Sequence, residues 1–472
     1  MSDLAIVWFR RDFRLADNPA LDYARSHHER ILPVYIHDPH AMGHWSPGAA
    51  SRWWLHHALT DVSGRLKDRG VKLIIRSGSA GNQLDELIEA SGAGAVYWNR
   101  LYEPVLVQRD TKIKQALREQ AIEARSFRAA VLFEPWELMT QDDQPYRVFT
   151  PYWNRMQRDW RSLQTASEPG ELTGPSKWPK SESIDSLNLL PGIDWDDGLA
   201  KRWQPDELAA RRAVRDFTDD AIQRYSDARN RPDKRGTSSM SPYLHFGQIS
   251  PRQIVQILNE SGDLPTGKGA LSYVRELAWR EFSIALLHHF PQTSDQALQS
   301  RFRNFPWREA REYADDLRAW QRGQTGIPLV DAGMRELWHT GWMHNRVRMV
   351  VASFLTKNLL IPWQEGARWF WDTLVDADLA NNTQGWQWTA GCGADAAPYF
   401  RIFNADLQAE KFDPKAEYIH TWCPELNDLD HKALGKMTDY ERKRRGYPMR
   451  LVDLKATRVR ALKAFDQIKQ AN

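Results

Sequence analysis

The first 130 residues alternate short runs of β-branched and aromatic residues with longer helical patterns. The strand-like runs are LAIVWF (4–9), ILPVYI (31–36), KLIIR (72–76) and AVYWN (95–99). Helical patterns occupy 49–69, 81–91 and 107–124, and a last strand-like stretch, RSFRAAVLFEP, ends near residue 135. Strands that alternate with helices need crossover connections, so this pattern predicts a parallel sheet covered by helices.

The composition changes after this region. Residues 165–205 are rich in Ser, Pro and Gly, which indicates an irregular surface connection. Beyond it, strand signals nearly vanish, and apolar stripes at helical spacing run along 271–286 and 337–360. We therefore expect a fold of α/β plus all-α class, with an α/β domain at 1–135, a linker at 136–205 and a helical domain at 206–472.

The whole-chain composition is that of an ordinary globular protein. Hydrophobic residues make up 42% of 472 residues, and the longest apolar runs are too short to span a bilayer. The N-terminus lacks the order of charges of a secretory signal, and two cysteines provide no disulfide framework. We expect a cytoplasmic monomer without a membrane partner. A net charge of +3 is only weakly indicative of a phosphate-rich partner.

Tryptophan is unusually frequent, with 22 residues. Such side chains bury large areas, so a tryptophan-rich core is the interpretation that composition alone favours. Rings that stack on bases or pass electrons are the alternative.

The segment GTSSMSPYLHFGQISPRQ (236–253) contains two capping patterns. Ser241 and Pro242 are predicted as an N-cap and first helical position, while Ser250 and Gln253 form a capping box. The hydroxyl groups in front of the first helix could bind a pyrophosphate. Simple capping is common and, for this segment alone, is the favoured interpretation.

Two further helices carry polar faces. On the predicted helix 272–282, Glu276, Trp279 and Arg280 share one face. This face could stack on and hydrogen-bond a base, or it could be a row of solvated charges with one tryptophan at its edge. In TGWMHNRVRMVVASFL (340–355), Asn345 and Arg346 could reach bases or phosphates, and a buried Arg348 would need an acidic partner.

One histidine of the second of these segments raises the question of a metal. His344 has no companion at the spacing of metal ligands, so we expect it to be structural.

The segment LVDADLANNTQGWQW (374–388) is the densest polar cluster. It combines carboxylates, amides and indoles within thirteen residues: Asp376, Asp378, Asn381, Asn382, Trp386 and Trp388. No third or fourth metal ligand is evident, and we predict no metal site. A pocket for a polar heteroaromatic ring fits better, because amides and carboxylates can satisfy its edge.

These motifs resemble the photolyase/cryptochrome family along essentially the whole chain, most of all bacterial cyclobutane pyrimidine dimer photolyases. The matching segments, in order, are VWFRRDFRLADNPAL, GTSSMSPYLHFGQISPRQ, TGWMHNRVRM, DADLANNTQGWQW, APYFRIFN and KFDP. The resemblance implies a Rossmann-like antenna domain joined by a long linker to a helical catalytic domain that binds FAD.

The same resemblance assigns residues to FAD. They are Tyr225, Thr237, Ser238, Ser239, Met240, Ser241, Tyr273, Arg348, Asp376, Ala377, Asp378 and Asn382. Arg348 would pair with Asp376, and Asn382 would face the reactive ring nitrogen of the flavin. Photolyases carry Asn at this position, whereas plant cryptochromes carry Asp and animal ones Cys. A neutral amide adds no negative charge beside a reduced, anionic flavin.

The resemblance also implies damaged DNA containing pyrimidine dimers as the substrate. Its contacts would be Arg229, Glu276, Trp279, Arg280, Asn345, Arg346, Met349, Trp388 and Gln408. Glu276, Asn345 and Asn382 would act in catalysis, and photolyases that act on (6-4) photoproducts carry His where Asn345 stands. The implied activity is light-driven splitting of cyclobutane dimers. A cryptochrome photoreceptor and a light-independent flavoprotein are the alternatives.

Two further features follow from the resemblance. Trp386, Trp363 and Trp307 match the chain of tryptophans that photoreduces the flavin, with Trp342, Trp369 and Trp371 as branches or core residues. The segment WSPGAASRWWLHHAL (45–59) resembles a bacterial branch that uses methenyltetrahydrofolate as antenna, although YEPVLVQRD (102–110) lacks an Asn-Glu pair common in folate-binding relatives. A deazaflavin or no antenna stays open.

Overall fold

The computed structural model describes residues 3–158, 160, 164–264, 266–395 and 400–470. By its contacts the chain divides into two compact units. The first unit comprises Met1–Asp194, Trp203–Ile222 and Ser238–Pro291, and the second comprises Trp195–Arg202, Gln223–Thr237 and Gln292–Asn472.

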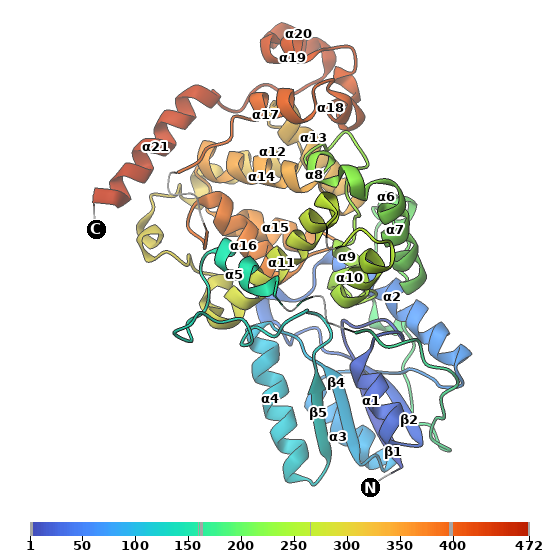
Figure 1. The fold of residues 1–472 in the computed structure, drawn as a ribbon. Helices are drawn as coiled ribbons and strands as arrows, with labels where there is room; N and C mark the ends of the chain where they lie inside the picture. The colour runs from blue at the N-terminus through green and yellow to red at the C-terminus, as the bar shows by residue number, and fades with distance from the viewer. Residues whose placement is uncertain (1–2, 159, 161–163, 265, 396–399, 471–472) are drawn as a thin grey trace. The chain divides into compact units, whose positions relative to one another are not determined.

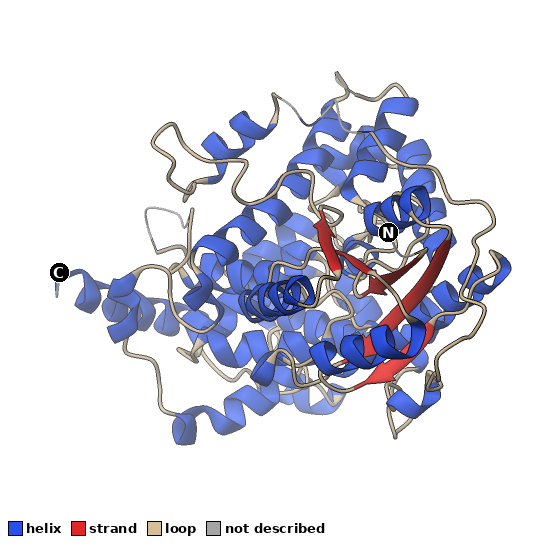
Figure 2. Ribbon diagram, turned by 90° about the horizontal axis from the view of Figure 1, so that it is seen from below, coloured by secondary structure: helices blue, strands red, loops and turns tan. Residues whose placement is uncertain are grey.

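The first unit contains a five-stranded sheet with every pairing parallel, as the sequence predicted (Figures 1 and 2). Its strands are β1 (Leu4–Phe9), β2 (Arg30–His37), β3 (Ile74–Ser77), β4 (Ala95–Asn99) and β5 (Glu123–Phe127). The order β3-β2-β1-β4-β5 places the reversal of strand order between β1 and β4.

Two boundaries differ from the prediction. The helix expected over 107–124 is α4 (Pro104–Glu119), because the chain leaves helical geometry at Ala121, which has a φ of 58°. The next strand, β5, therefore begins at residue 123, and most of the stretch predicted as strand up to 135 is loop.

Both faces of this sheet are covered, which explains the nearly continuous apolar strands. One face packs Ile6, Trp8 and Val34 against side chains of α3 (Ala80–Ser91) and α4. The helix α1 (Pro19–His27) contacts β1, β2, β4 and β5.

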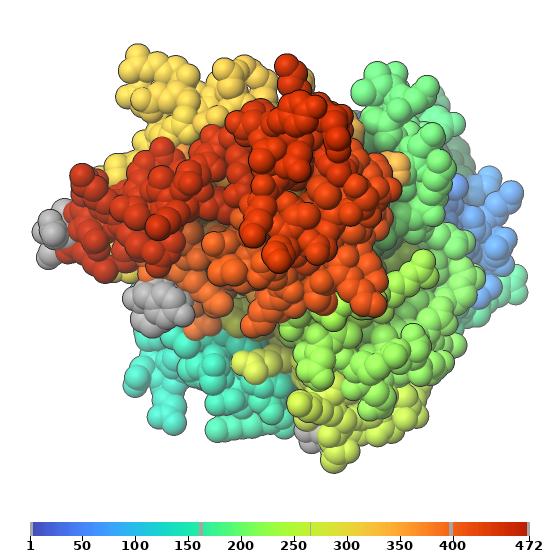
Figure 3. Space-filling model, turned by 90° about the horizontal axis from the view of Figure 1, so that it is seen from above, coloured from blue at the N-terminus to red at the C-terminus, as the bar shows by residue number. Residues whose placement is uncertain are grey.

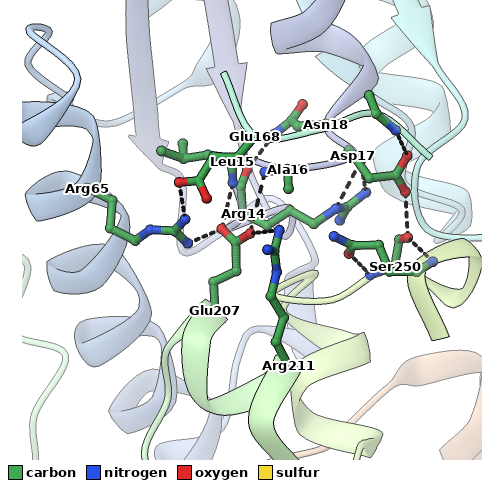
Figure 4. Close-up of polar contacts among 12 residues, drawn as sticks. Arg14, Leu15, Ala16, Asp17, Asn18, Arg65, Glu168, Glu207, Arg211 and Ser250 are labelled. Carbon is green, nitrogen blue, oxygen red and sulfur yellow. Dashed lines mark hydrogen bonds and ion pairs between the residues drawn. The ribbon is translucent and has the colours of Figure 1, made fainter. Parts of the chain in front are cut away.

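Buried charges fix two later helices to the loop that follows β1 (Figure 4). The fully buried carboxylate of Glu207, at the start of α7 (Glu207–Asp220), accepts hydrogen bonds from the amides of Leu15 (2.7 Å) and Ala16 (3.4 Å) and pairs with Arg65. Asp17 accepts a 2.5 Å hydrogen bond from the hydroxyl of Ser250.

The remaining helices of the first unit are α2 (Ala49–Asp68), α5 (Phe149–Met156), α9 (Ser241–His245), α10 (Pro251–Glu260) and α11 (Lys268–His289). Because α7, α10 and α11 belong to the same unit as the sheet, this division does not follow boundaries at 135 and 205. Those boundaries stay a prediction. Within the described residues 164–196, one 3-10 turn (Asp185–Leu187) is the only regular element, as expected for an irregular connection.

The described part of the second unit is helical. Its helices are α6 (Asp197–Arg202), α8 (Tyr225–Ala228), α12 (Ala310–Gln321), α13 (Pro328–Thr340), α14 (Asn345–Ser353), α15 (Trp363–Thr373), α16 (Leu379–Ala390), α17 (Ala405–Phe412), α18 (Glu417–Trp422), α19 (His431–Lys436), α20 (Asp439–Arg445) and α21 (Leu454–Gln470). Among the described residues, no helix is both long and apolar enough to cross a membrane.

The apolar stripe predicted along 337–360 spans several elements instead of one helix. Gly341, with a φ of 65°, caps the C-terminus of α13, and an added Cβ there would lie 2.8 Å from Val375. The chain then forms α14 and a π-helical turn (Phe354–Asn358). The apolar spacing continues across these breaks because each of the separate elements buries apolar side chains.

Candidate active site

The hydroxyl-rich loop of residues 237–241 leads into α9. The helix starts at Ser241 with Met240 as N-cap, so the predicted cap at Ser241 is wrong by one residue. Ser239 lies in the left-handed region (φ 52°), and the Ser238 hydroxyl is 2.8 Å from that of the buried Tyr273. A helix this short offers little dipole to an anion, so hydroxyl groups and loop amides are the binding groups available here.

The second capping pattern is confirmed. The Ser250 hydroxyl accepts the Gln253 amide N–H at 3.0 Å, and the Gln253 side chain accepts the Ser250 N–H at 2.9 Å. This capping box starts α10.

One face of α11 presents a partly exposed indole. Trp279 lies flat on the ring of Phe149, with centroids 3.6 Å apart and an interplanar angle of 8°. Phe149 is buried, and the guanidinium of Arg275 lies 5.4 Å from its ring centroid. Glu276, one turn earlier on the same helix, is also partly exposed.

The neighbouring residues of α11 hold a loop. Arg280 donates a 2.7 Å hydrogen bond to the carbonyl of Ala130. The buried carboxylate of Glu281 accepts hydrogen bonds from the amides of Leu132 (2.5 Å) and Phe133 (3.1 Å). Burial raises the pKa of Glu281 to about 7. Arg280, one of the predicted DNA contacts, therefore already has a hydrogen-bond partner within the protein.

In the second unit, Arg348 forms the ion pair expected of it. Its guanidinium donates to both carboxylate oxygens of Asp376, at 2.8 and 3.1 Å, and to the carbonyl of Met343 at 2.8 Å. The Asp376 side chain is 3% exposed, so the pair neutralises a charge that burial would otherwise make costly. The neighbouring Ala377 is buried.

His344 is the N-cap of α14. Its Nδ1 accepts the amide N–H of Arg346 at 3.1 Å. Burial and the nearby guanidinium groups of Arg346, Arg348 and Arg229 lower the pKa of His344 to about 4. The structural role expected for His344 is confirmed, and the helix it caps begins with the exposed Asn345.

The polar cluster of residues 376–388 is arranged around the start of α16. Asp378 is the N-cap, and its carboxylate accepts from the Asn381 amide (2.9 Å) and side chain (2.7 Å). The Asn382 side chain donates from Nδ2 to the carbonyl of Ala367 at 2.9 Å. That bond fixes the amide plane and leaves Oδ1 as the acceptor on its other edge.

The remaining candidates for DNA contacts in this unit include two arginines that lie on aromatic rings. Arg346 donates to the side chain of Asn230 at 2.6 Å and lies 4.4 Å from the Phe412 ring. Arg229 lies 5.6 Å from the ring of the buried Tyr225.

Other candidate contacts are less exposed or line a pocket. Met349 is partly buried, and Gln408 has a buried Oε1 without a hydrogen-bond partner in the described structure. Trp388 lines a pocket that also includes Arg301 and the buried Lys357, whose pKa burial lowers to about 7.

Trp386 and Trp363, two members of the predicted electron relay, are buried, and Trp307 is partly exposed. Trp386 packs edge-on against Phe370 (5.0 Å) and Trp320 (6.1 Å). The relay itself stays a prediction.

Three further tryptophans were predicted as branches or core residues. Trp342 and Trp371 are buried. Trp369 is partly exposed and stacks on Trp338 (5.9 Å, 6°).

Among the described residues, no group of three or more His, Cys, Asp or Glu side chains could hold a metal ion.

Sequence reasoning missed Phe149 and Asn230, which fix Trp279 and Arg346. Phe149 lies in an ordinary short helix 130 positions before its partner. No local pattern connects the two.

Comparisons with known proteins identify the family of the chain. A family model described as DNA photolyase matches residues 5–170, and one described as the FAD binding domain of DNA photolyase matches residues 273–467. A deoxyribodipyrimidine photo-lyase of Agrobacterium fabrum is 42% identical over 98% of both chains. Cryptochrome-2 of Arabidopsis thaliana is 37% identical over 91% of this chain and 72% of its own.

The fold is also that of a solved relative. The crystal structure of a bacterial class III photolyase from Agrobacterium tumefaciens superposes with a TM-score of 0.94 at 42% identity, covering 100% of this chain and 98% of that one. The parallel sheet and the FAD-binding helical region define a flavoprotein of α/β plus all-α architecture. Within that class, the chain belongs to the DNA photolyase/cryptochrome family.

Proposed function

We propose that the protein is a deoxyribodipyrimidine photolyase, which uses light to split cyclobutane pyrimidine dimers in DNA. The observation that carries this proposal is Asn382, a neutral amide held in one orientation by the carbonyl of Ala367. Asp or Cys stands at this position in cryptochromes, and an amide tolerates a reduced, anionic ring without adding charge. The 42% identity to a protein named as a photolyase supports the same activity.

The residues present suit FAD. The Ser238 hydroxyl, Tyr273 and the loop amides would bind its phosphates, since hydroxyl and amide donors suit anions. Tyr225, Thr237, Ser239, Met240 and Ser241 complete that group. Asp376 and Asp378, with Ala377, would bind the sugar-like chain and the ring edge, while Arg348 pairs with Asp376. When bound and reduced, FAD supplies the light-excited electron that opens the cyclobutane ring.

The remaining residues would bind the lesion. A damaged pair leaves the duplex at a cost of a few kcal/mol. Trp279 and Trp388 each offer an indole for stacking, about 1–3 kcal/mol per base. Glu276 would accept a hydrogen bond from the pyrimidine edge, with Asn345 and Met349 beside the lesion. Arg229, Arg346, Arg280 and Gln408 would bind the flanking backbone.

Trp386, Trp363 and Trp307 would restore the reduced state of FAD by passing electrons. Burial of the first two favours this role, because it excludes water from the indole rings. A folate antenna is part of the same proposal, with a deazaflavin as the alternative. So are a monomeric state and a cytoplasmic location.

A cryptochrome photoreceptor is the second candidate, and the 37% identity to Cryptochrome-2 favours it. A dimer-containing oligonucleotide distinguishes the two. We expect the reduced holoprotein to restore intact pyrimidines under blue light and to do nothing in darkness. The Glu276→Ala variant should keep its FAD and lose most of its repair yield. A wild-type holoprotein that leaves the dimer intact under light would establish the photoreceptor instead.

A further inference from the structure

Positive charge is concentrated in the last 42 residues. Residues 431–472 hold 12 Lys and Arg against 4 Asp and Glu, whereas the rest of the chain holds 52 against 57. A net charge of +8 on this segment therefore stands beside −5 on the other 430 residues. The helices α19, α20 and α21 carry most of it.

The cations of this segment fall into two groups. The buried and partly buried cations have protein partners. Arg442 donates to the carbonyls of Gly326 and Pro448, and Arg445 pairs with Asp428. The second group is exposed, and within the described residues none of its members forms an ion pair. It includes Lys432, Lys436, Lys443, Arg444, Lys455 and Lys463.

Helical spacing places these exposed cations in outward rows. Lys432 and Lys436 are four residues apart on α19. Lys455 and Lys463 are eight apart on α21 with the 61% exposed Val459 between them. Figure 3 shows the segment, in red, at the surface of the molecule.

The row on α20 adds an aromatic ring. Tyr440 is 74% exposed and precedes Lys443 and Arg444 by three and four residues. An aromatic ring beside cations suits a base and its phosphates. We propose that α19–α21 form a second DNA-binding surface, which contacts phosphates and unpaired bases irrespective of damage. This inference rests on the proposed function.

A lipid surface fits these helices less well. A membrane-binding helix must offer an apolar face, but the apolar side of α21 is used inside the protein. Ala461, Ala464 and Ile468 are buried, and Phe465 stacks on Phe400 with centroids 4.4 Å apart. The side chains of α21 that remain exposed are mainly charged, which suits the dense phosphates of DNA.

Salt dependence of binding to an undamaged duplex tests the proposal. We expect the triple variant Lys443→Gln, Arg444→Gln, Lys463→Gln to bind more weakly. Its slope of log K against log salt should fall by about 0.9 for each phosphate that the variant no longer neutralises. The control variant Lys67→Gln, Lys112→Gln, Arg118→Gln removes equal charge from exposed sites on α2 and α4 and should keep the wild-type slope.

Four outcomes decide the matter. Equal slopes in the triple variant and its control would overturn the proposal, as would weaker binding to phosphatidylglycerol vesicles with unchanged DNA binding. Tyr440→Ala should lower affinity for single-stranded DNA several-fold, and Tyr440→Phe should restore it. If the wild type repairs nothing under light while these cations still govern DNA binding, the proposed function fails and this surface stands.

Discussion

Phe149 lies face to face with Trp279, with ring centroids 3.6 Å apart and planes 8° from parallel. Phe282 meets both rings edge-on, at 5.8 and 5.9 Å. One face of the indole is therefore covered, and its plane is held by buried neighbours. If Trp279 stacks on a base, it must do so with its other face, in an orientation set before DNA arrives.

Removing this support should weaken binding of the lesion. We expect Phe149→Leu, which keeps an apolar side chain but no ring, to raise the Kd for dimer-containing DNA about 2- to 12-fold, the equivalent of about 0.5–1.5 kcal/mol for an aromatic pair. Phe149→Tyr keeps the ring and should behave as wild type. FAD content should be unchanged in both. Unaltered Kd in Phe149→Leu would show that the stack does not position Trp279.

Removing one partner of the Arg348–Asp376 pair should destabilise the protein more than removing both charges together. Arg348→Met leaves the Asp376 carboxylate buried without its partner, which costs about 3–5 kcal/mol for a fully buried pair and less here, since the Arg348 side chain is 24% exposed. Adding Asp376→Asn should recover part of that stability. Denaturant unfolding of the two single variants and the double variant measures the coupling; additive losses would contradict it.

Both single variants should also retain less FAD, because Asp376 is among the residues proposed to bind it. The flavin-to-protein absorbance ratio after dialysis measures this loss. Arg318→Gln is a suitable control, because it breaks an exposed pair with Asp315 and should leave the ratio unchanged.

Stability should fall as the pH falls from about 6.5 to about 4, in part because of His344. Its pKa is about 4 in the folded protein and about 6.5 when unfolded, so the unfolded state binds the extra proton in this range. Protonated Nδ1 could not accept the Arg346 N–H, and α14 would lose its cap.

The His344→Asn variant tests this pH dependence. Asn caps helices well and does not titrate, so this variant should keep stability near pH 8 and lose less of it on acidification. Thermal unfolding at several pH values measures the difference. Parallel wild-type and variant curves across this range would mean that His344 does not titrate as described.

Trp386→Phe should separate photoreduction from repair. The substitution keeps an aromatic ring against Phe370 and Trp320 but removes the readily oxidised indole. We expect light-driven reduction of FAD to slow greatly, while chemically reduced protein repairs dimers at the wild-type rate. Trp45→Phe, at a buried site in the first unit, is the control. Loss of both activities in Trp386→Phe would place Trp386 in the binding of FAD or lesion instead.

Local patterns were enough for much of the chain. The strand–helix alternation predicted the parallel sheet, since β-branched runs and 3.6-residue periods depend on neighbours in sequence. The capping box at Ser250 and Gln253 could be predicted for the same reason. The boundary at β5 was not, because the left-handed turn at Ala121 comes from a residue type that seldom adopts it.

What the sequence by itself determined is the set of chemical groups and the elements that carry them, including Arg348 on a mostly apolar helix, where it needed an acidic partner. Only the tertiary structure decided which groups meet: Phe149 with Trp279, Arg346 with Asn230, and Glu207 with the amides of Leu15 and Ala16. Each pair joins residues more than 100 positions apart. Burial and packing choose such partners, and neither leaves a local trace in the order of amino acids.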